Sequence, residues 1–129
     1  MNIEHAIEAT PRDLRGAART AVLEFSDALF AIEKKWGELG TDARVLWIDA
    51  QTFSLFTPEG LRRALKRVAG VSAWLENWSD FSKKGSPEDD SDWAEIHGAQ
   101  NASEAALKAL YAVVDFAREK VTRSITEDR

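Results

Sequence analysis

Hydrophobic side chains recur along this chain at alternating spacings of three and four residues, which is the period of one face of an α-helix. The first such stretch follows Thr10 and Pro11, a pair typical of a helix start, and it predicts a helix over residues 11–39. Gly40 suits the left-handed position just after the end of that helix. The apolar stripe of this helix consists of Ala18, Val22, Phe25, Leu29, Ile32, Trp36 and Leu39.

Residues 45–56 form a segment that is apolar on all sides instead of along one stripe, so periodicity leaves a short buried helix and a strand both open. Its first residues have the composition of a strand, but the chain contains no second run of that kind with which it would pair. We therefore predict a short helix. Because it is apolar all round, we expect the rest of the bundle or another chain to cover it on most sides.

A third helix is predicted over about residues 58–84, because Thr57 and Pro58 repeat the helix-start pair. Residues 85–90 then form a loop by composition. Two neighbouring stripes give this helix a broad apolar face. They consist of Leu61, Leu65, Val68, Ser72 and Leu75, and of Val71, Trp74, Trp78 and Phe81.

The last predicted helix begins after a capping serine, Ser91, and continues almost to the end of the chain. Gly98 weakens it locally, because glycine costs about 1 kcal/mol relative to alanine inside a helix. The pattern leaves open whether the helix is continuous or kinked at that point. Its stripe consists of Trp93, Ile96, Gln100, Ser103, Leu107, Leu110, Val114, Ala117 and Val121.

Composition places the chain among ordinary globular domains, with 129 residues of which 44% are hydrophobic and 30% charged. The absence of cysteine excludes disulfides and thiolate metal sites, and the longest apolar run is too short to span a membrane. No secretory signal is visible, so a cytoplasmic location is expected. The fold class predicted is all-α: one antiparallel bundle of about four helices, one of them short, over residues 1–129, with frayed tails at 1–9 and 126–129.

Net charge bears on the class of partner. The formal charge of −5 is the reverse of the bias typical of nucleic-acid-binding domains. A local basic stripe nevertheless occurs on the third predicted helix, where four side chains lie two by two at helical spacing. We interpret it as a solvated face, and contact with phosphates or an acidic partner is the alternative. The stripe consists of Arg62, Arg63, Lys66 and Arg67.

Polar side chains with possible chemistry gather on one face of the last predicted helix: His97, Gln100, Asn101 and Glu104. A metal site needs three or four ligands, and the chain has just one other histidine, His5. We therefore predict a polar patch with no metal and no cofactor. A small metal- or proton-dependent enzyme centred on His97 is the third functional hypothesis.

Five tryptophans in a chain of this length supply much apolar surface. Trp74 and Trp78 lie one turn apart on a flank of the third helix, and Leu23 and Phe30 share a flank of the first. Since these flanks lie beside stripes that already form a core, we predict that they bind a partner. The leading hypothesis is a non-enzymatic interaction module, namely a subunit, adaptor or inhibitor, with a homodimer or another protein as partner. The alternative is a helical subunit associated with nucleic acid, and no membrane contact is expected.

Overall fold

The protein is a bundle of α-helices. The computed structural model describes residues 2–37, 40–85 and 90–127, with side chains described there except at 36, 78–85, 90–93, 124 and 126–127. Within these ranges every regular element is helical, which confirms the predicted all-α class. In chain order the elements are α1 (Ile3–Glu8), α2 (Arg12–Trp36), α3 (Gly40–Gln51), the 3-10 turn η1 (Ser54–Phe56), α4 (Pro58–Gly85) and α5 (Asp90–Glu127).

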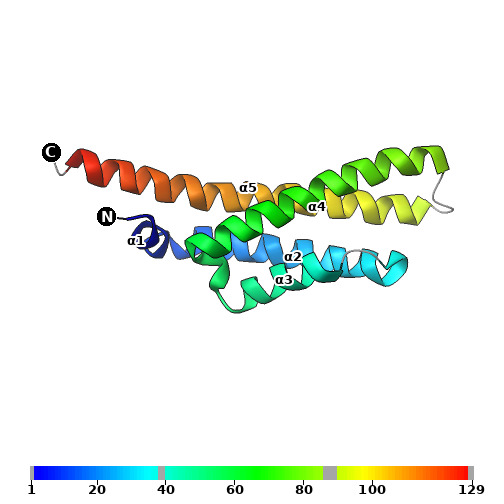
Figure 1. The fold of residues 1–129 in the computed structure, drawn as a ribbon, viewed down its shortest axis with the longest axis horizontal. Helices are drawn as coiled ribbons and strands as arrows, with labels where there is room; N and C mark the ends of the chain where they lie inside the picture. Colours follow the sequence, from blue (N-terminus) through cyan, green and yellow to red (C-terminus); the bar gives the residue numbers. More distant parts are fainter. Residues whose placement is uncertain (1, 38–39, 86–89, 128–129) are drawn as a thin grey trace.

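The molecule is elongated, with both termini at the same end (Figure 1). α3 folds back along α2, and α4 runs across α5, the longest helix. With 38 residues, α5 extends for about 57 Å. α2 packs along both α3 and α5, and so joins α3 to the pair formed by α4 and α5. None of the described helices combines the length and the apolar character needed to cross a bilayer.

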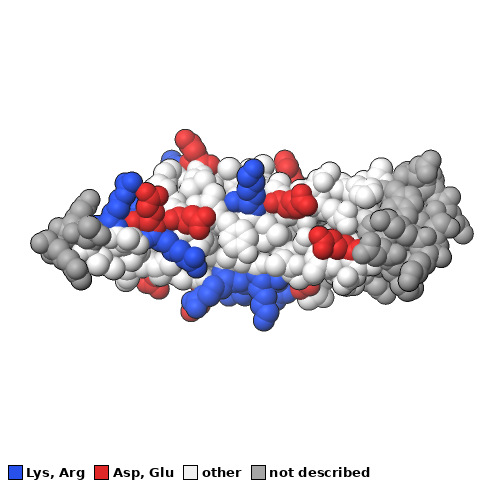
Figure 2. Space-filling view, turned by 90° about the horizontal axis from the view of Figure 1, so that it is seen from above, with Lys and Arg blue, Asp and Glu red and all other residues white. Residues whose placement is uncertain are grey.

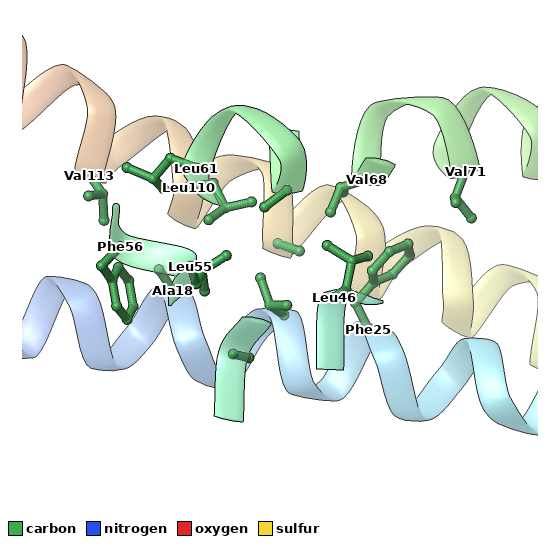
Figure 3. Packing of buried hydrophobic residues seen from close by; sticks show 14 of the residues in the cluster. Ala18, Phe25, Leu46, Leu55, Phe56, Leu61, Val68, Val71, Leu110 and Val113 are labelled. Carbon is green, nitrogen blue, oxygen red and sulfur yellow. The ribbon is translucent and has the colours of Figure 1, made fainter. Parts of the chain in front are cut away.

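The core follows a strict alternation of three-residue and four-residue steps on each long helix, the pattern by which helices pack at shallow angles. Figure 3 shows these side chains from α2, α3, η1, α4 and α5 meeting in one layer. The predicted stripe of α2 is confirmed from Ala18 to Ile32, and Trp36 and Leu39 lie outside the described side chains. The buried stripes are Leu61, Ala64, Val68, Val71 and Leu75 on α4, and Ile96, Ala99, Ser103, Ala106, Leu110, Val113 and Ala117 on α5.

On α4 and α5 these stripes share every second residue with the predicted ones, and the buried residues between them lie one position earlier than predicted. Ala64 is buried where Leu65 is half-buried, and Ala106 is buried where Leu107 is half-buried. The sequence pattern gives most weight to large side chains, but helices approach most closely where the side chains are small. The large residues therefore pack to the sides of the line of closest approach.

Residues 45–51 are helical, so the prediction of a helix instead of a strand is confirmed for most of the segment 45–56. The remainder is a tight turn into η1. In this turn Phe53 has a φ of 62°, and it is the one non-glycine residue with positive φ in the described part of the chain. Within the chain α3 is buried on one side, through Ala43, Leu46, Asp49 and Ala50. The described part of the bundle therefore does not cover it on most sides, and cover by another chain stays a prediction.

The expectation of a frayed amino-terminal tail is wrong for residues 3–8. These residues form a helix that packs on α4 and α5. Asn2 caps this helix by accepting a hydrogen bond from the His5 N–H at 3.0 Å. Ala6 and Ile7 are buried, and burial of apolar side chains is what holds so short a helix in place. Thr10 was predicted to cap α2. Its hydroxyl instead donates to the Ala6 carbonyl at 3.0 Å and closes the end of α1.

Two helix boundaries also differ from the sequence pattern. α2 ends at Trp36, and Gly37 takes the left-handed conformation (φ 80°) that was predicted for Gly40. Gly40 is the first residue of α3. α5 is continuous through Gly98 and extends to Glu127, so residues 126 and 127 are helical. α5 begins at Asp90, so Ser91, the predicted cap, is already a residue of the helix. The predicted loop residues 86–89 and residues 128–129 lie outside the described structure.

Candidate functional site

The predicted partner-binding flanks are half-buried in the structure. Leu23, Phe30 and Trp74 pack against the core, and they fill the margins of the helix interfaces instead of standing free of them. The side chain of Trp78 lies outside the described residues. Most of the surface that the sequence offered for docking is therefore used to widen the core.

Three of the six large apolar side chains exposed in the described part of the chain lie on α3 and in the turn that follows it. Trp47 is 38% exposed, Ile48 is 46% exposed and Phe53 is 59% exposed. Trp47 and Ile48 are adjacent on the side of α3 opposite Leu46, and we call these two residues the outer face of α3. The sequence signal for this face was the all-round apolar character of residues 45–56, which pointed to contacts beyond one side.

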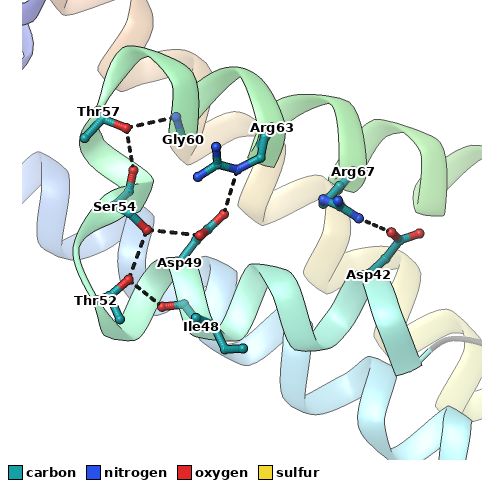
Figure 4. A network of polar contacts seen from close by, with 9 residues as sticks. All are labelled: Asp42, Ile48, Asp49, Thr52, Ser54, Thr57, Gly60, Arg63 and Arg67. Atoms are coloured by element: carbon teal, nitrogen blue, oxygen red, sulfur yellow. Dashed lines mark hydrogen bonds and ion pairs between the residues drawn. The ribbon is translucent and has the colours of Figure 1, made fainter.

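The predicted basic stripe is partly neutralised by carboxylates on α3. Arg63 Nε lies 3.3 Å from Asp49 Oδ2, and Arg67 forms an ion pair with Asp42 (Figure 4). Arg62 Nε donates to the Pro58 carbonyl at 3.3 Å, and Lys66 is exposed. Figure 2 shows a row of basic side chains along one edge of the molecule and both signs of charge close together elsewhere on that face. Two of the four cations thus hold α4 against α3.

The Arg63–Asp49 pair belongs to a polar network that closes the turn between α3 and α4 (Figure 4). The Ser54 hydroxyl donates to Asp49 Oδ1 at 3.0 Å and lies 3.0 Å from the Thr52 hydroxyl, which donates to the Ile48 carbonyl at 2.9 Å. The Thr57 hydroxyl accepts from the Gly60 N–H at 3.0 Å, which confirms Thr57 as the cap of α4. Both neighbours of Phe53 are therefore held by hydrogen bonds.

A pocket lies between this turn and the first half of α2. It is a cavity of about 400 Å³ lined by Arg12, Arg15, Gly16, Arg19, Phe53 and Phe56, and we call it the arginine pocket. The three arginines and Gly16 recur at helical spacing, so they share one face of α2. The volume falls within the usual range of small-molecule sites, about 300–1,000 Å³.

The two phenylalanines of the arginine pocket support two of its arginines. The guanidinium carbon of Arg19 lies 4.4 Å from the centre of the Phe53 ring, and that of Arg15 lies 5.8 Å from the centre of the Phe56 ring. Both distances are within the range of cation–π attraction. Figure 3 shows Phe56 reaching from η1 towards α2 beside Ala18.

Among the described residues, no carboxylate is paired with an arginine of the arginine pocket, so Arg12, Arg15 and Arg19 form no ion pair there. The Nε atom of Arg19 is buried and has no hydrogen-bond partner there. A buried donor without an acceptor costs about 1–3 kcal/mol. Three cations with no paired carboxylate among the described residues favour a bound anion, which would supply the opposite charge.

The predicted polar cluster on α5 is brought together in part. His97 Nδ1 lies 3.2 Å from Gln100 Oε1, and Gln100 Nε2 donates to the Leu75 carbonyl of α4 at 3.2 Å. His97, Asn101 and Glu104 are exposed. The described residues include no group of three histidine or acidic side chains placed to hold a metal ion. Gln100 therefore links α5 to α4, and His97 contacts Gln100 from the exposed side of α5.

Sequence reasoning missed the arginine pocket. The spacing of its arginines along α2 was visible, but the stripe on residues 62–67 has the same spacing and a denser charge. The neighbouring surface distinguishes the two: carboxylates face the stripe on residues 62–67, and phenylalanine rings face the arginine pocket.

Comparison of the chain with protein-family models, curated proteins and solved structures finds no match.

Proposed function

We propose that the protein is a non-enzymatic helical interaction module that associates with a second copy of itself through the outer face of α3. The observation that supports this proposal is the exposure of Trp47 and Ile48 side by side on one helix. Each large side chain exposed in this way forfeits the free energy of burial, about 25 cal/mol per Å² of apolar surface. A partner that covers both side chains recovers that free energy.

A second copy fits this face because a two-fold contact covers two identical apolar surfaces at once and needs no other binding surface. Arg44 and Gln51 flank the apolar pair at helical spacing, so each copy places one cation beside the apolar contact. α3 has 12 residues and is about 18 Å long, so a contact limited to it is small. We therefore expect a weak, reversible dimer in the micromolar range or above.

The alternative of a nucleic-acid-associated subunit has less support. Arg63 and Arg67 are engaged by Asp49 and Asp42, which leaves the basic stripe with fewer charges for phosphates than its sequence suggests. For the enzyme hypothesis centred on His97, the supporting observation is the 3.2 Å contact between His97 Nδ1 and Gln100 Oε1. Trp47 and Ile48 are large apolar side chains exposed next to each other on one helix, and this arrangement favours self-association over the two other hypotheses.

Sedimentation equilibrium over low micromolar to near-millimolar protein tests this proposal. The wild-type chain should shift from 14.4 kDa towards twice that mass as its concentration rises. Trp47→Gln with Ile48→Gln should remain monomeric, because the apolar face is lost while the helix is retained. Tyr111→Gln, at a side chain on α5 that is 50% exposed, is the matched control and should dimerise like the wild type.

Two results would overturn the proposal. One is a wild-type chain that stays at 14.4 kDa over the whole concentration range. The other is equal loss of the dimer in Tyr111→Gln and in the α3 variant, since general hydrophobic association would then explain it. Far-UV circular dichroism of each variant establishes that the helices are intact.

A further inference from the structure

The arginine pocket has three cations and, among the described residues, no carboxylate paired with them. This differs from the other basic cluster, in which Arg63 and Arg67 each contact an acidic side chain of α3. The chain as a whole is acidic, so three unpaired arginines on one helix face are a local concentration of positive charge. An oxyanion is the ligand that such an arrangement attracts.

The pocket is built before any ligand arrives. Arg19 rests on the ring of Phe53, and Arg15 lies over the ring of Phe56, which limits the freedom that these long side chains would lose on binding. Phe53 reaches this position through a left-handed backbone, which is unfavourable for a residue that carries a Cβ. The hydrogen bonds of Thr52 and Ser54 hold that conformation from both sides (Figure 4).

The lining also restricts the class of ligand. Three guanidinium groups match a dianion with several acceptor oxygens better than a single carboxylate. The phenyl rings and the bare backbone at Gly16 offer an apolar wall, so an organic group beside the anion finds contacts as well. No atom lies within 4 Å of the position that a Cβ of Gly16 would take, which leaves room at that point.

We infer that the arginine pocket binds a phosphate monoester, with the phosphate held by Arg12, Arg15 and Arg19 and the organic portion packed against Phe53 and Phe56. This binding does not depend on self-association, because the outer face of α3 contributes no residue to the pocket. The phosphate belongs either to a free small molecule or to a phosphorylated side chain of another protein.

Titration of the ¹⁵N-labelled protein by NMR tests the inference, with phenyl phosphate as the probe and ionic strength held constant. The amide signals of Gly16 and Ser54 should shift and saturate. Phenyl phosphate should bind at least tenfold more tightly than inorganic phosphate or benzoate, because these probes lack the ring and the second charge respectively. A blocked phosphotyrosine peptide then distinguishes the sources: tighter binding than phenyl phosphate indicates a protein ligand, and weaker binding indicates a small molecule.

Variants separate the pocket from general attraction to cations. Arg15→Gln and Arg19→Gln should each weaken phenyl phosphate binding at least tenfold, and Lys66→Gln should leave it unchanged. Gly16→Leu should block the pocket without altering charge, and Gly70→Leu on α4 is its matched control, since a Cβ also meets nothing there. Thermal melts identify any variant that is unfolded.

The inference is overturned by absence of saturation at Gly16 and Ser54, by tighter binding of benzoate than of phenyl phosphate, or by equal loss of affinity in Lys66→Gln. Because self-association is measured by mass and ligand binding by these shifts, either proposal can fail while the other stands. The Trp47→Gln, Ile48→Gln chain should still bind phenyl phosphate.

Discussion

At the scale of single residues, Asp49 decides how the turn between α3 and α4 closes. It is a carboxylate with 7% of its surface exposed, and burial of a charge is costly unless partners satisfy it. Its two oxygens are used separately, one by the Ser54 hydroxyl and the other by Arg63. Sequence periodicity could not assign this role, because an acidic residue inside an apolar segment is normally expected at the surface.

Asp49→Ala should lower the free energy of unfolding by about 1–3 kcal/mol, because Ser54 and Arg63 both lose an acceptor. The loss stays moderate since the Arg63 side chain is 46% exposed and water can replace the carboxylate. Urea denaturation followed by circular dichroism measures it. Asp42→Ala is the control: its partnership with Arg67 is more exposed, and its removal should cost about 1 kcal/mol or less. Equal losses in the two variants would contradict this account.

At the scale of elements, the existence of the long helices follows from patterns that the sequence displays openly. Proline at the start of α4, a threonine cap before it and apolar residues every three or four positions all act within one helix. The line of closest approach between helices could not be predicted in the same way. Ala64 on α4 and Ala106 on α5 are buried because a neighbouring helix passes close to them, and that neighbour is distant in sequence.

The junction of η1 and α4 supplies an element-scale prediction. A Cβ at Gly60 would lie 1.8 Å from the backbone oxygen of Ser54, so Gly60→Ala requires the backbone to move and should destabilise the protein by several kcal/mol. Gly98→Ala is the matched substitution, because Gly98 is exposed inside α5, beyond its first two turns, and a Cβ there meets nothing within 4 Å. It should stabilise the protein by up to about 1 kcal/mol. Thermal denaturation compares the two, and a shift of the same sign in both would refute the argument.

At the scale of the whole molecule, α1 closes one end of the bundle. Ile7 contributes with Leu61 and Val114 to the lining of a cavity between α1, α4 and α5. Six residues are too few for a helix to be stable in isolation, so its formation depends on this contact. The predicted frayed tail therefore becomes part of the core for a reason that no local pattern contains.

Ile7→Ala should destabilise the protein by about 2–5 kcal/mol, the range for a buried aliphatic side chain cut back to alanine. Hydrogen exchange should show the loss of protection first in α1 and in the part of α5 that it covers. Ile3→Ala serves as the control, since Ile3 is 41% exposed, and should change stability by less than about 1 kcal/mol. Wild-type exchange in α1 of Ile7→Ala would show that this helix forms without its buried contact.

The sequence by itself determined the helical class, the number of long helices and most residues of the α2 stripe, because caps and three–four periodicity depend on residues within one or two turns of each other. The tertiary structure alone decided which apolar flanks are covered, which arginines of α4 find carboxylates and where three arginines of α2 meet two phenylalanines. Those outcomes depend on the sides that α2, α3 and α4 turn towards one another. That orientation is the joint result of packing over the whole core, so no single segment encodes it.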